Sequence, residues 1–289
     1  MTSCSSWADV VRLLAVPQHQ GAIVPDAGRL PTGCAALADL AGEVLGLAGH
    51  TVAVATGGTP LTGGVANFGG LLANRWAQLA ALRSVREPVL LIGGDCGVDA
   101  TTLAVARLRV GEGLGVVWWD AHADLHTPAT SPSNAFHGMA LRAALGEGDR
   151  ALVADPPLPP GHAVLAGTRS MEPAEREAID DGLAALVAPE RARDGRAVAE
   201  AAVSTGMSQV YLHIDLDVLD PEEFRGSCVP VPGGLTVAEV VAGIEAVADA
   251  LPVVGVGITE CTTTRPAELQ RLVPLLEAVG ATLFAARGR

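Results

Sequence analysis

The chain has 289 residues, a formal net charge of −13 and no lysine, so all basic residues are arginines. Hydrophobic residues make up 49% of the chain and charged residues 18%, which excludes an intrinsically disordered chain and predicts a large buried core. An acidic chain without a basic patch is a poor candidate for binding nucleic acid. No apolar run reaches the roughly 20 residues of a membrane-spanning helix, so we expect no membrane segment.

Strands and helices are predicted to alternate along the chain. In the first half we expect strands at 10–16, 51–55, 89–92 and 115–119, and helices at 35–47, 71–85 and 99–108. In the second half we expect strands at 163–166, 210–214 and 253–258, an eighth near 183–187, and helices at 137–145, 197–203, 236–250 and 265–279, the last kinked at Pro274. This alternation predicts a parallel sheet covered on both faces. No linker or break in composition divides the chain, so residues 1–289 are expected to form a single domain.

The cysteines are odd in number and widely spaced. They are Cys4, Cys34, Cys96, Cys228 and Cys261. None forms a Cys-x-x-Cys pair, which argues against a zinc knuckle or a thioredoxin-type site. Free cysteines fit a reducing compartment, and the first residues lack the pattern of a signal peptide. We therefore predict a cytoplasmic protein.

An apolar run at 115–119 leads directly into Asp120, His122 and Asp124. Alternate residues of an extended chain point the same way, so two carboxylates and an imidazole converge where this strand ends. Burying that much charge is costly unless the groups are paired or bound to a cation. The pattern predicts a divalent metal site, and the alternative is a polar strand end with a helix cap.

A second apolar run, at 210–214, is followed by Asp215 and Asp217 in the same alternation. Two such strand ends indicate one shared centre. A carboxylate-rich ligand set with a single imidazole suits Mn²⁺ better than a thiolate-rich zinc site would. Four carboxylates are more than one ion requires, so we expect two metal ions.

Five short motifs, in this order, resemble those of the ureohydrolase superfamily, which includes arginase and agmatinase. The motifs are Gly93-Gly94-Asp95-Cys96, residues 120–124, 133–139 and 215–221, and Thr259-Glu260. The resemblance extends from Gln18 to about Glu268. It implies a three-layer α/β/α fold with an eight-stranded parallel sheet, and a homo-oligomer, either a trimer or a hexamer. The chain departs from the family pattern at Cys96, where most members carry a metal-binding histidine.

The resemblance assigns the metal ligands. They are Cys96, Asp120, His122, Asp124, Asp215 and Asp217. Asp120 and Asp215 would bridge two Mn²⁺ ions, which lower the pKa of a water molecule that attacks a guanidino carbon, with Asp124 orienting it. Another divalent metal stays possible, because the thiolate of Cys96 is a softer ligand than an imidazole. If Cys96 is instead an ordinary small buried residue, one metal site would be weak or empty and the protein nearly inactive.

Two further residues receive catalytic roles from the resemblance. Glu260 would accept hydrogen bonds from a guanidinium, and His137 would carry a proton to the leaving amine. The alternatives are a helix cap or surface position for Glu260 and a structural hydrogen bond for His137. Asp95 and Asp220 are expected to be structural.

The substrate-binding positions match the family only in part. His126, Ser131 and Ser133 occupy the positions that hold the amino-acid carboxylate in arginase, and Glu172 matches an acid near the substrate amine. We therefore expect a metal-dependent amidinohydrolase that releases urea from arginine, or hydroxyurea from N-hydroxyarginine. Agmatine, a guanidino acid or a formimino compound stays open as the substrate.

Two rival functions predict different features of the chain. A zinc deacetylase on a related fold would need a pair of histidines and a tyrosine near the metal, but the single tyrosine, Tyr211, lies inside a predicted strand. A non-catalytic protein that lost one metal through Cys96 would bind one ion or none and release no urea.

Overall fold

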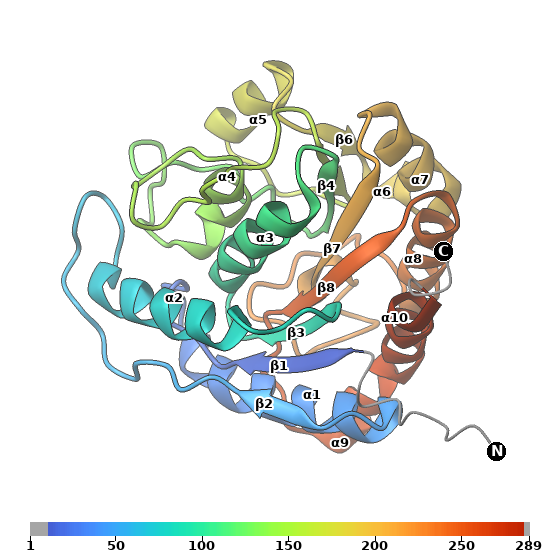
Figure 1. Cartoon of the computed structure of the whole chain (residues 1–289), viewed down its shortest axis with the longest axis horizontal. Coiled ribbons are helices and arrows are strands. Elements are labelled where there is room, and N and C mark those ends of the chain that lie inside the picture. Colours follow the sequence, from blue (N-terminus) through green and yellow to red (C-terminus); the bar gives the residue numbers. More distant parts are fainter. Residues whose placement is uncertain (1–10, 286–289) are drawn as a thin grey trace.

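The computed structural model describes residues 11–285, and within that range eight strands form one sheet (Figure 1). The strands are β1 (Arg12–Val16), β2 (Gly49–Thr51), β3 (Val89–Gly93), β4 (Leu114–Trp119), β5 (Ala163–Ala166), β6 (Ala185–Val187), β7 (Gln209–Asp215) and β8 (Val253–Thr259). All neighbouring pairs are parallel, in the order β2-β1-β3-β8-β7-β4-β5-β6. This confirms the predicted eight-stranded parallel sheet.

Helices cover both faces of the sheet, which gives the expected three layers (Figure 1). One layer contains α1 (Leu30–Leu45), α6 (Pro189–Ala192), α7 (Gly195–Ser204), α8 (Val237–Ala250) and α10 (Val273–Ala285). The other contains α2 (Phe68–Leu82), α3 (Gly97–Val110), α4 (Ala140–Ala144) and α5 (Pro173–Asp180). Short helical turns complete the chain at Ala27–Arg29, His137–Met139, Leu216–Val218, α9 (Pro266–Leu269) and Gln270–Leu272.

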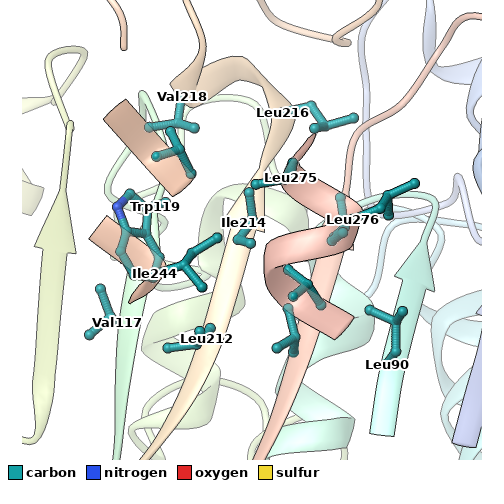
Figure 2. Close-up of a cluster of buried hydrophobic side chains, with 14 of the residues drawn as sticks. Leu90, Val117, Trp119, Leu212, Ile214, Leu216, Val218, Ile244, Leu275 and Leu276 are labelled. Atoms are coloured by element: carbon teal, nitrogen blue, oxygen red, sulfur yellow. The ribbon is translucent and has the colours of Figure 1, made fainter. Parts of the chain in front are cut away.

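The larger hydrophobic core lies between the sheet and the layer that contains α8 and α10 (Figure 2). Trp119 of β4 and Ile214 of β7 point into it, and both are fully buried. Because side chains alternate along a strand, their neighbours Trp118 and His213 point to the opposite face. The central strands are therefore buried on both sides, which explains their continuous apolar sequences.

Several predicted boundaries were wrong. The strand expected at 51–55 is β2 at Gly49–Thr51, because the backbone N–H and carbonyl of Ala55 bond to the side chains of Asn74 and Gln20 instead of a strand. The helix expected at 35–47 begins at Leu30, with Pro31 in its first turn, where a missing N–H is harmless. The strand expected at 10–16 begins at Arg12, and Val10 lies outside the described residues.

The helix expected at 265–279 is also different. The chain forms α9, a turn at Gln270–Leu272 and then α10. Pro274 therefore lies in the first turn of α10 and does not kink a longer helix. None of the helices within residues 11–285 combines the length and apolar character that crossing a bilayer requires.

The parallel arrangement places the carboxyl ends of all eight strands along one edge of the sheet. Open α/β sheets bind their ligands at this edge. Four adjacent central strands, β3, β8, β7 and β4, each lead there into a segment with a carboxylate or a thiol.

Candidate metal centre

The segment after β4 supplies Asp120, His122 and Asp124. Asp120 is fully buried, and its Oδ1 and Oδ2 accept hydrogen bonds from the His122 backbone N–H (2.6 Å) and from Trp118 Nε1 (3.0 Å). Asp124 is buried in a left-handed backbone conformation (φ 52°), which a non-glycine residue adopts only at some cost. This turn brings Asp124 to the wall of the same pocket as His122.

The segment after β7 meets the segment after β4. The chain enters a helical turn immediately after Asp215, so that the Asp217 N–H donates to Asp215 Oδ1 at 2.8 Å. Asp217 then accepts a hydrogen bond from the Ala121 N–H (3.1 Å), and its other oxygen lies 3.1 Å from His122 Nδ1. The two strand ends therefore converge on one centre, as their matched alternation predicted.

Cys96 precedes α3 and is buried next to Asp215. Its Sγ lies 3.1 Å from Asp215 Oδ2, 3.2 Å from Thr259 Oγ1 and 3.5 Å from His213 Nε2. The Cys96 backbone N–H donates to Glu260 Oε1 at 3.1 Å. The position after β3 is therefore joined to the ends of both β7 and β8.

Glu260 follows β8 in a left-handed conformation (φ 66°). Its Oε1 lies 3.2 Å from His137 Nδ1, so the two predicted catalytic residues are direct neighbours. The strained backbones of Asp124 and Glu260 both occur at this one centre, as is common at functional sites.

Within residues 11–285, three groups of potential ligand atoms lie within 4.8 Å of one another. They are Cys96–Asp215–Glu260, Asp120–His122–Asp217 and Cys96–Asp120–His213. Five of the six predicted ligands belong to these groups. Asp124, the sixth, lies beside them in the pocket without joining a group, whereas Glu260 and His213 join groups although the sequence did not suggest them as ligands.

The negative charge of these buried carboxylates is poorly compensated by the other side chains of the protein. Burial, and then the charge of Asp217, raise the pKa of Asp120 to about 6, and burial raises the pKa of Asp124 and Asp215 well above the usual value. Burial lowers the pKa of His122, but its hydrogen bonds to Asp120 and Asp217 outweigh this and raise it to about 12. The centre therefore favours additional positive charge.

Unpartnered oxygens indicate where that charge would bind. Asp124 Oδ2 and Glu260 Oε2 are buried and have no hydrogen-bond partner among the described residues. Buried polar atoms are normally satisfied, so an orphaned carboxylate oxygen at such a centre needs a ligand. These two atoms fit cationic or hydrogen-bonding ligands, and the converging carboxylates fit divalent cations.

A pocket of about 150 Å³ opens onto the centre. Its walls include Val24, His122, Asp124, His126, Ser133, His137, Gly138, Ser170, Glu172, Glu175, Asp215, Asp217, Val229 and Glu260. Of the predicted substrate-binding residues, His126, Ser133 and Glu172 line it. Ser131 does not, and its hydroxyl lies 3.4 Å from that of Ser133.

Comparison with known protein families decides the family of this chain. The model of the arginase family matches residues 52–269, well over half of the chain. The chain belongs to the arginase family. The arginase of Bacillus caldovelox is 39% identical over 170 residues, and that of Entamoeba histolytica is 32% identical over 163 residues. These matches span 56% and 55% of the relatives, so the chain matches about half the length of each.

Solved structures of arginases share the fold over nearly the whole chain. The Bacillus caldovelox arginase superposes with a TM-score of 0.82 at 26% identity, covering 95% of this chain and 98% of that one. A proclavaminate amidinohydrolase from Streptomyces clavuligerus superposes with a TM-score of 0.73 at 21% identity, covering 97% and 93%, and shows the fold alone.

Asp95 and Asp220 have the structural contacts expected from the sequence. Asp95 accepts hydrogen bonds from the Gln18 side chain and from the backbones of Gly21 and Gly97, which ties the loop after β3 to the loop after β1. Asp220 accepts from the backbones of Gly233 and Gly234 and holds an exposed turn.

Two residues at the centre, His213 and Asp99, were not predicted from the sequence. His213 lies inside β7 and contacts Cys96, and Asp99 of α3 lies behind it, with Oδ2 2.5 Å from His213 Nδ1. The available signal was a histidine within an otherwise apolar strand, two residues before Asp215 and therefore on the same face.

Proposed function

We propose that the protein is a binuclear-metal amidinohydrolase that releases urea, or a substituted urea such as hydroxyurea, from a guanidino substrate such as arginine or N-hydroxyarginine. The observation that carries the proposal is the convergence of Cys96, Asp215 and Glu260 with Asp120, His122 and Asp217 beneath one pocket. Membership of the arginase family supports the same chemistry.

Two Mn²⁺ ions are the cofactors that we propose, held by Cys96, Asp120, His122, Asp124, Asp215 and Asp217. When bound, such ions lower the pKa of water and so supply a nucleophile near neutral pH. The side chains then have separate tasks. Asp124, with its free Oδ2 on the pocket wall, orients the attacking water by a hydrogen bond. Glu260 accepts hydrogen bonds from the guanidinium through its unpartnered Oε2.

His137 is the residue that we propose to deliver the proton to the leaving amine. It lines the pocket, and its Nδ1 lies 3.2 Å from Glu260 Oε1. Burial lowers the pKa of His137, but the hydrogen bond to Glu260 outweighs this and raises it, so the imidazole can hold a proton. A histidine paired with a carboxylate beside the reacting bond is suited to general acid catalysis.

The outer part of the pocket would recognise the rest of the substrate. Glu172 lies at the pocket wall, with Oε2 3.5 Å from His126 Nε2, and Ser133 contributes a hydroxyl. The described wall includes several acids and no arginine, which suits a cationic substrate. We therefore assign the substrate amine to Glu172 and the carboxylate to His126 and Ser133, with Ser131 supporting Ser133.

Further parts of the proposal concern the whole protein. The four described cysteines are all free and buried, which fits a reducing cytoplasm. We propose that residues 1–289 act as one domain and that the protein assembles as a trimer or hexamer without nucleic-acid or membrane partners. The mass of the purified protein in solution, measured by light scattering, tests the assembly.

The activity is tested by incubating Mn²⁺-loaded protein with arginine, N-hydroxyarginine, agmatine, a guanidino acid and a formimino compound. We expect release of urea or hydroxyurea from an amino-acid guanidine and much slower release from agmatine, which lacks the carboxylate. Glu260→Gln should abolish turnover, whereas Glu268→Gln, outside the pocket, should not. Metal binding without turnover of any compound would favour a non-catalytic protein and refute the proposal.

A further inference from the structure

The face of β7 that leads to Asp215 carries two other polar residues. Tyr211, His213 and Asp215 alternate along the strand and therefore point to the same side, and all three are buried. His213 Nε2 lies 3.5 Å from Cys96 Sγ. A fully buried imidazole thus adjoins the one predicted metal ligand at which this chain departs from its family, and the proposed reaction gives it no task.

The His213 ring is held in one orientation. Its Nδ1 lies 2.5 Å from Asp99 Oδ2, and the ring stacks on Trp118 with centroids 3.4 Å apart and planes 11° from parallel. With Nδ1 bonded to the Asp99 carboxylate, the other ring nitrogen, Nε2, faces Cys96. A carboxylate behind the non-ligating ring nitrogen is the usual arrangement of metal-binding histidines.

The Asp99 side chain is closely packed by its neighbours. It is fully buried, and its Oδ1 accepts a hydrogen bond from the Tyr211 hydroxyl at 2.7 Å. Gly257 is the register partner of His213 on β8, and a Cβ at this position would overlap the Asp99 carboxylate. At Gly255, beside Tyr211, a Cβ would lie 2.9 Å from the tyrosine ring. Two glycines thus leave room for Asp99 and Tyr211.

We infer that His213 is a metal ligand on the Cys96 side of the centre and that Asp99 is its positioning residue. The inference rests on the proposed function, because it takes the centre to bind divalent ions. Cys96 Sγ, His213 Nε2 and an Asp120 carboxylate oxygen lie within 4.8 Å of one another. A sulfur and a nitrogen bound to one tetrahedral ion, at about 2.3 Å and about 2.0–2.1 Å, lie roughly 3.6 Å apart.

This ligand pair changes the character of one half of the centre. A thiolate and an imidazole are softer ligands than carboxylates. The Cys96 side should therefore prefer Co²⁺ or Zn²⁺ over Mn²⁺ more strongly than the side formed by Asp120, His122 and Asp217. The two ions of one protein would then differ in exchange rate and preferred metal.

Titration of the metal-free protein with Co²⁺ tests the inference, because a cobalt–thiolate bond gives a near-ultraviolet charge-transfer band. We expect the band in the wild-type protein. Asp99→Asn should weaken the affinity measured from this band about 10–100-fold, as is typical when a group behind a ligand is lost, and His213→Gln should weaken it further. His162→Gln is the matched control, since His162 hydrogen-bonds the Leu114 carbonyl away from the centre.

Folding is controlled by a double variant. His213→Gln alone leaves the Asp99 carboxylate buried with less compensation, whereas Asp99→Asn/His213→Gln makes both groups neutral. Circular dichroism of each metal-free variant establishes that it is folded, and the double variant should weaken the affinity measured from the band as much as His213→Gln does.

Each outcome decides a different claim. An unchanged band affinity in the folded His213 variants would overturn the inference and leave the proposed function intact. Cobalt binding without a thiolate band in the wild-type protein would also overturn the inference. A wild-type protein that binds no cobalt at all would overturn the inference and the proposed function together.

Discussion

Trp118 of β4 and His213 of β7 are register partners, and their rings stack 3.4 Å apart. Two residues further along each strand, Asp120 and Asp215 continue the same alternation at the edge of the sheet. The register that aligns the rings therefore also aligns the two carboxylates proposed to bridge the metal ions. A shift by one residue would send these side chains to the opposite face.

Asp217→Asn should weaken metal binding, whereas Asp220→Asn should not. Both residues belong to the segment after β7, but Asp217 is buried beside His122 and Asp220 holds an exposed turn. Loss of a direct ligand should cost at least the roughly 10–100-fold in affinity that follows loss of a supporting group. Isothermal titration with Mn²⁺ measures this difference, and equal affinities for the two variants would contradict the ligand assignment.

Cys96→His should not simply restore a typical family centre. Cys96 Sγ already has three neighbours between 3.1 and 3.5 Å, including His213, so a larger imidazole has no space. We expect overpacking to lower the free energy of unfolding by about 1–3 kcal/mol. Cys96→Ser, of nearly the same size, is the control. Urea denaturation of the metal-free proteins provides the values, and a histidine variant as stable as the wild type would refute the packing argument.

Gly257→Ala should disturb the centre from the neighbouring strand. A Cβ at this position overlaps the Asp99 carboxylate, so Asp99 must move away from His213. We expect a loss of about 1–3 kcal/mol in stability and weaker cobalt binding. Gly28→Ala is the control, since nothing lies within 4 Å of the added atom. Thermal unfolding and cobalt titration measure the two effects. A Gly257→Ala variant with unchanged stability and cobalt affinity would contradict the argument that Asp99 is held in one position.

The metal-free protein should lose stability as the pH rises. Burial raises the pKa of Asp120 and of Asp95 to about 6, while an unfolded aspartate titrates near about 3.9. Between these values the folded state binds more protons than the unfolded state, so the free energy of unfolding falls from about pH 4 to about pH 6. Bound metal needs the ionised form of Asp120 and should remove its share of the fall, whereas the share of Asp95, which is not among the proposed ligands, should remain.

Urea midpoints at several pH values between 4 and 7, with and without Mn²⁺, measure this effect. Asp217, whose pKa is lowered, acts in the opposite direction only below about pH 3.9, outside the window. Midpoints that rise with pH in the metal-free protein would show that the buried carboxylates carry no unfavourable charge.

Glu172→Gln should raise KM for an amino-acid guanidine several-fold and leave kcat nearly unchanged. Glu172 lies at the pocket wall, away from the converging ligand groups, so it contributes binding without entering the chemical step. Glu177→Gln, exposed on the same helix, is the control. Steady-state kinetics of the three proteins decide the point, and a fall in kcat at constant KM would place Glu172 in the chemistry instead.

The general plan of the fold could be read from the sequence because it follows from local rules. Continuous apolar runs such as residues 115–119 predict strands that are buried on both faces, and their alternation with helices predicts a parallel sheet. The strand near 51–55 was misplaced because side chains of Asn74 and Gln20, far along the chain, occupy the Ala55 backbone. Periodicity cannot show such contacts.

At the metal centre, too, some residues could be predicted from the sequence and others could not. Asp120 and Asp215 stand out in the sequence, because a charge directly after an apolar strand is unusual and alternation fixes its direction. His213 does not stand out, because its importance depends on Asp99 from α3 and on the space above Gly257, which only the packed structure brings together. Ser131 matched its family position, yet the loop directs it to Ser133 and not to the pocket wall.

The most direct test of the proposed hydrolase is the number of Mn²⁺ ions bound per chain, measured on the same sample that is assayed for urea and hydroxyurea release. We expect two ions per chain and turnover of an amino-acid guanidine, with both lost on removal of the metal. One ion or none, with no product from any guanidino compound, would contradict a binuclear hydrolase and would instead indicate an arginase-family protein with a degenerate metal site.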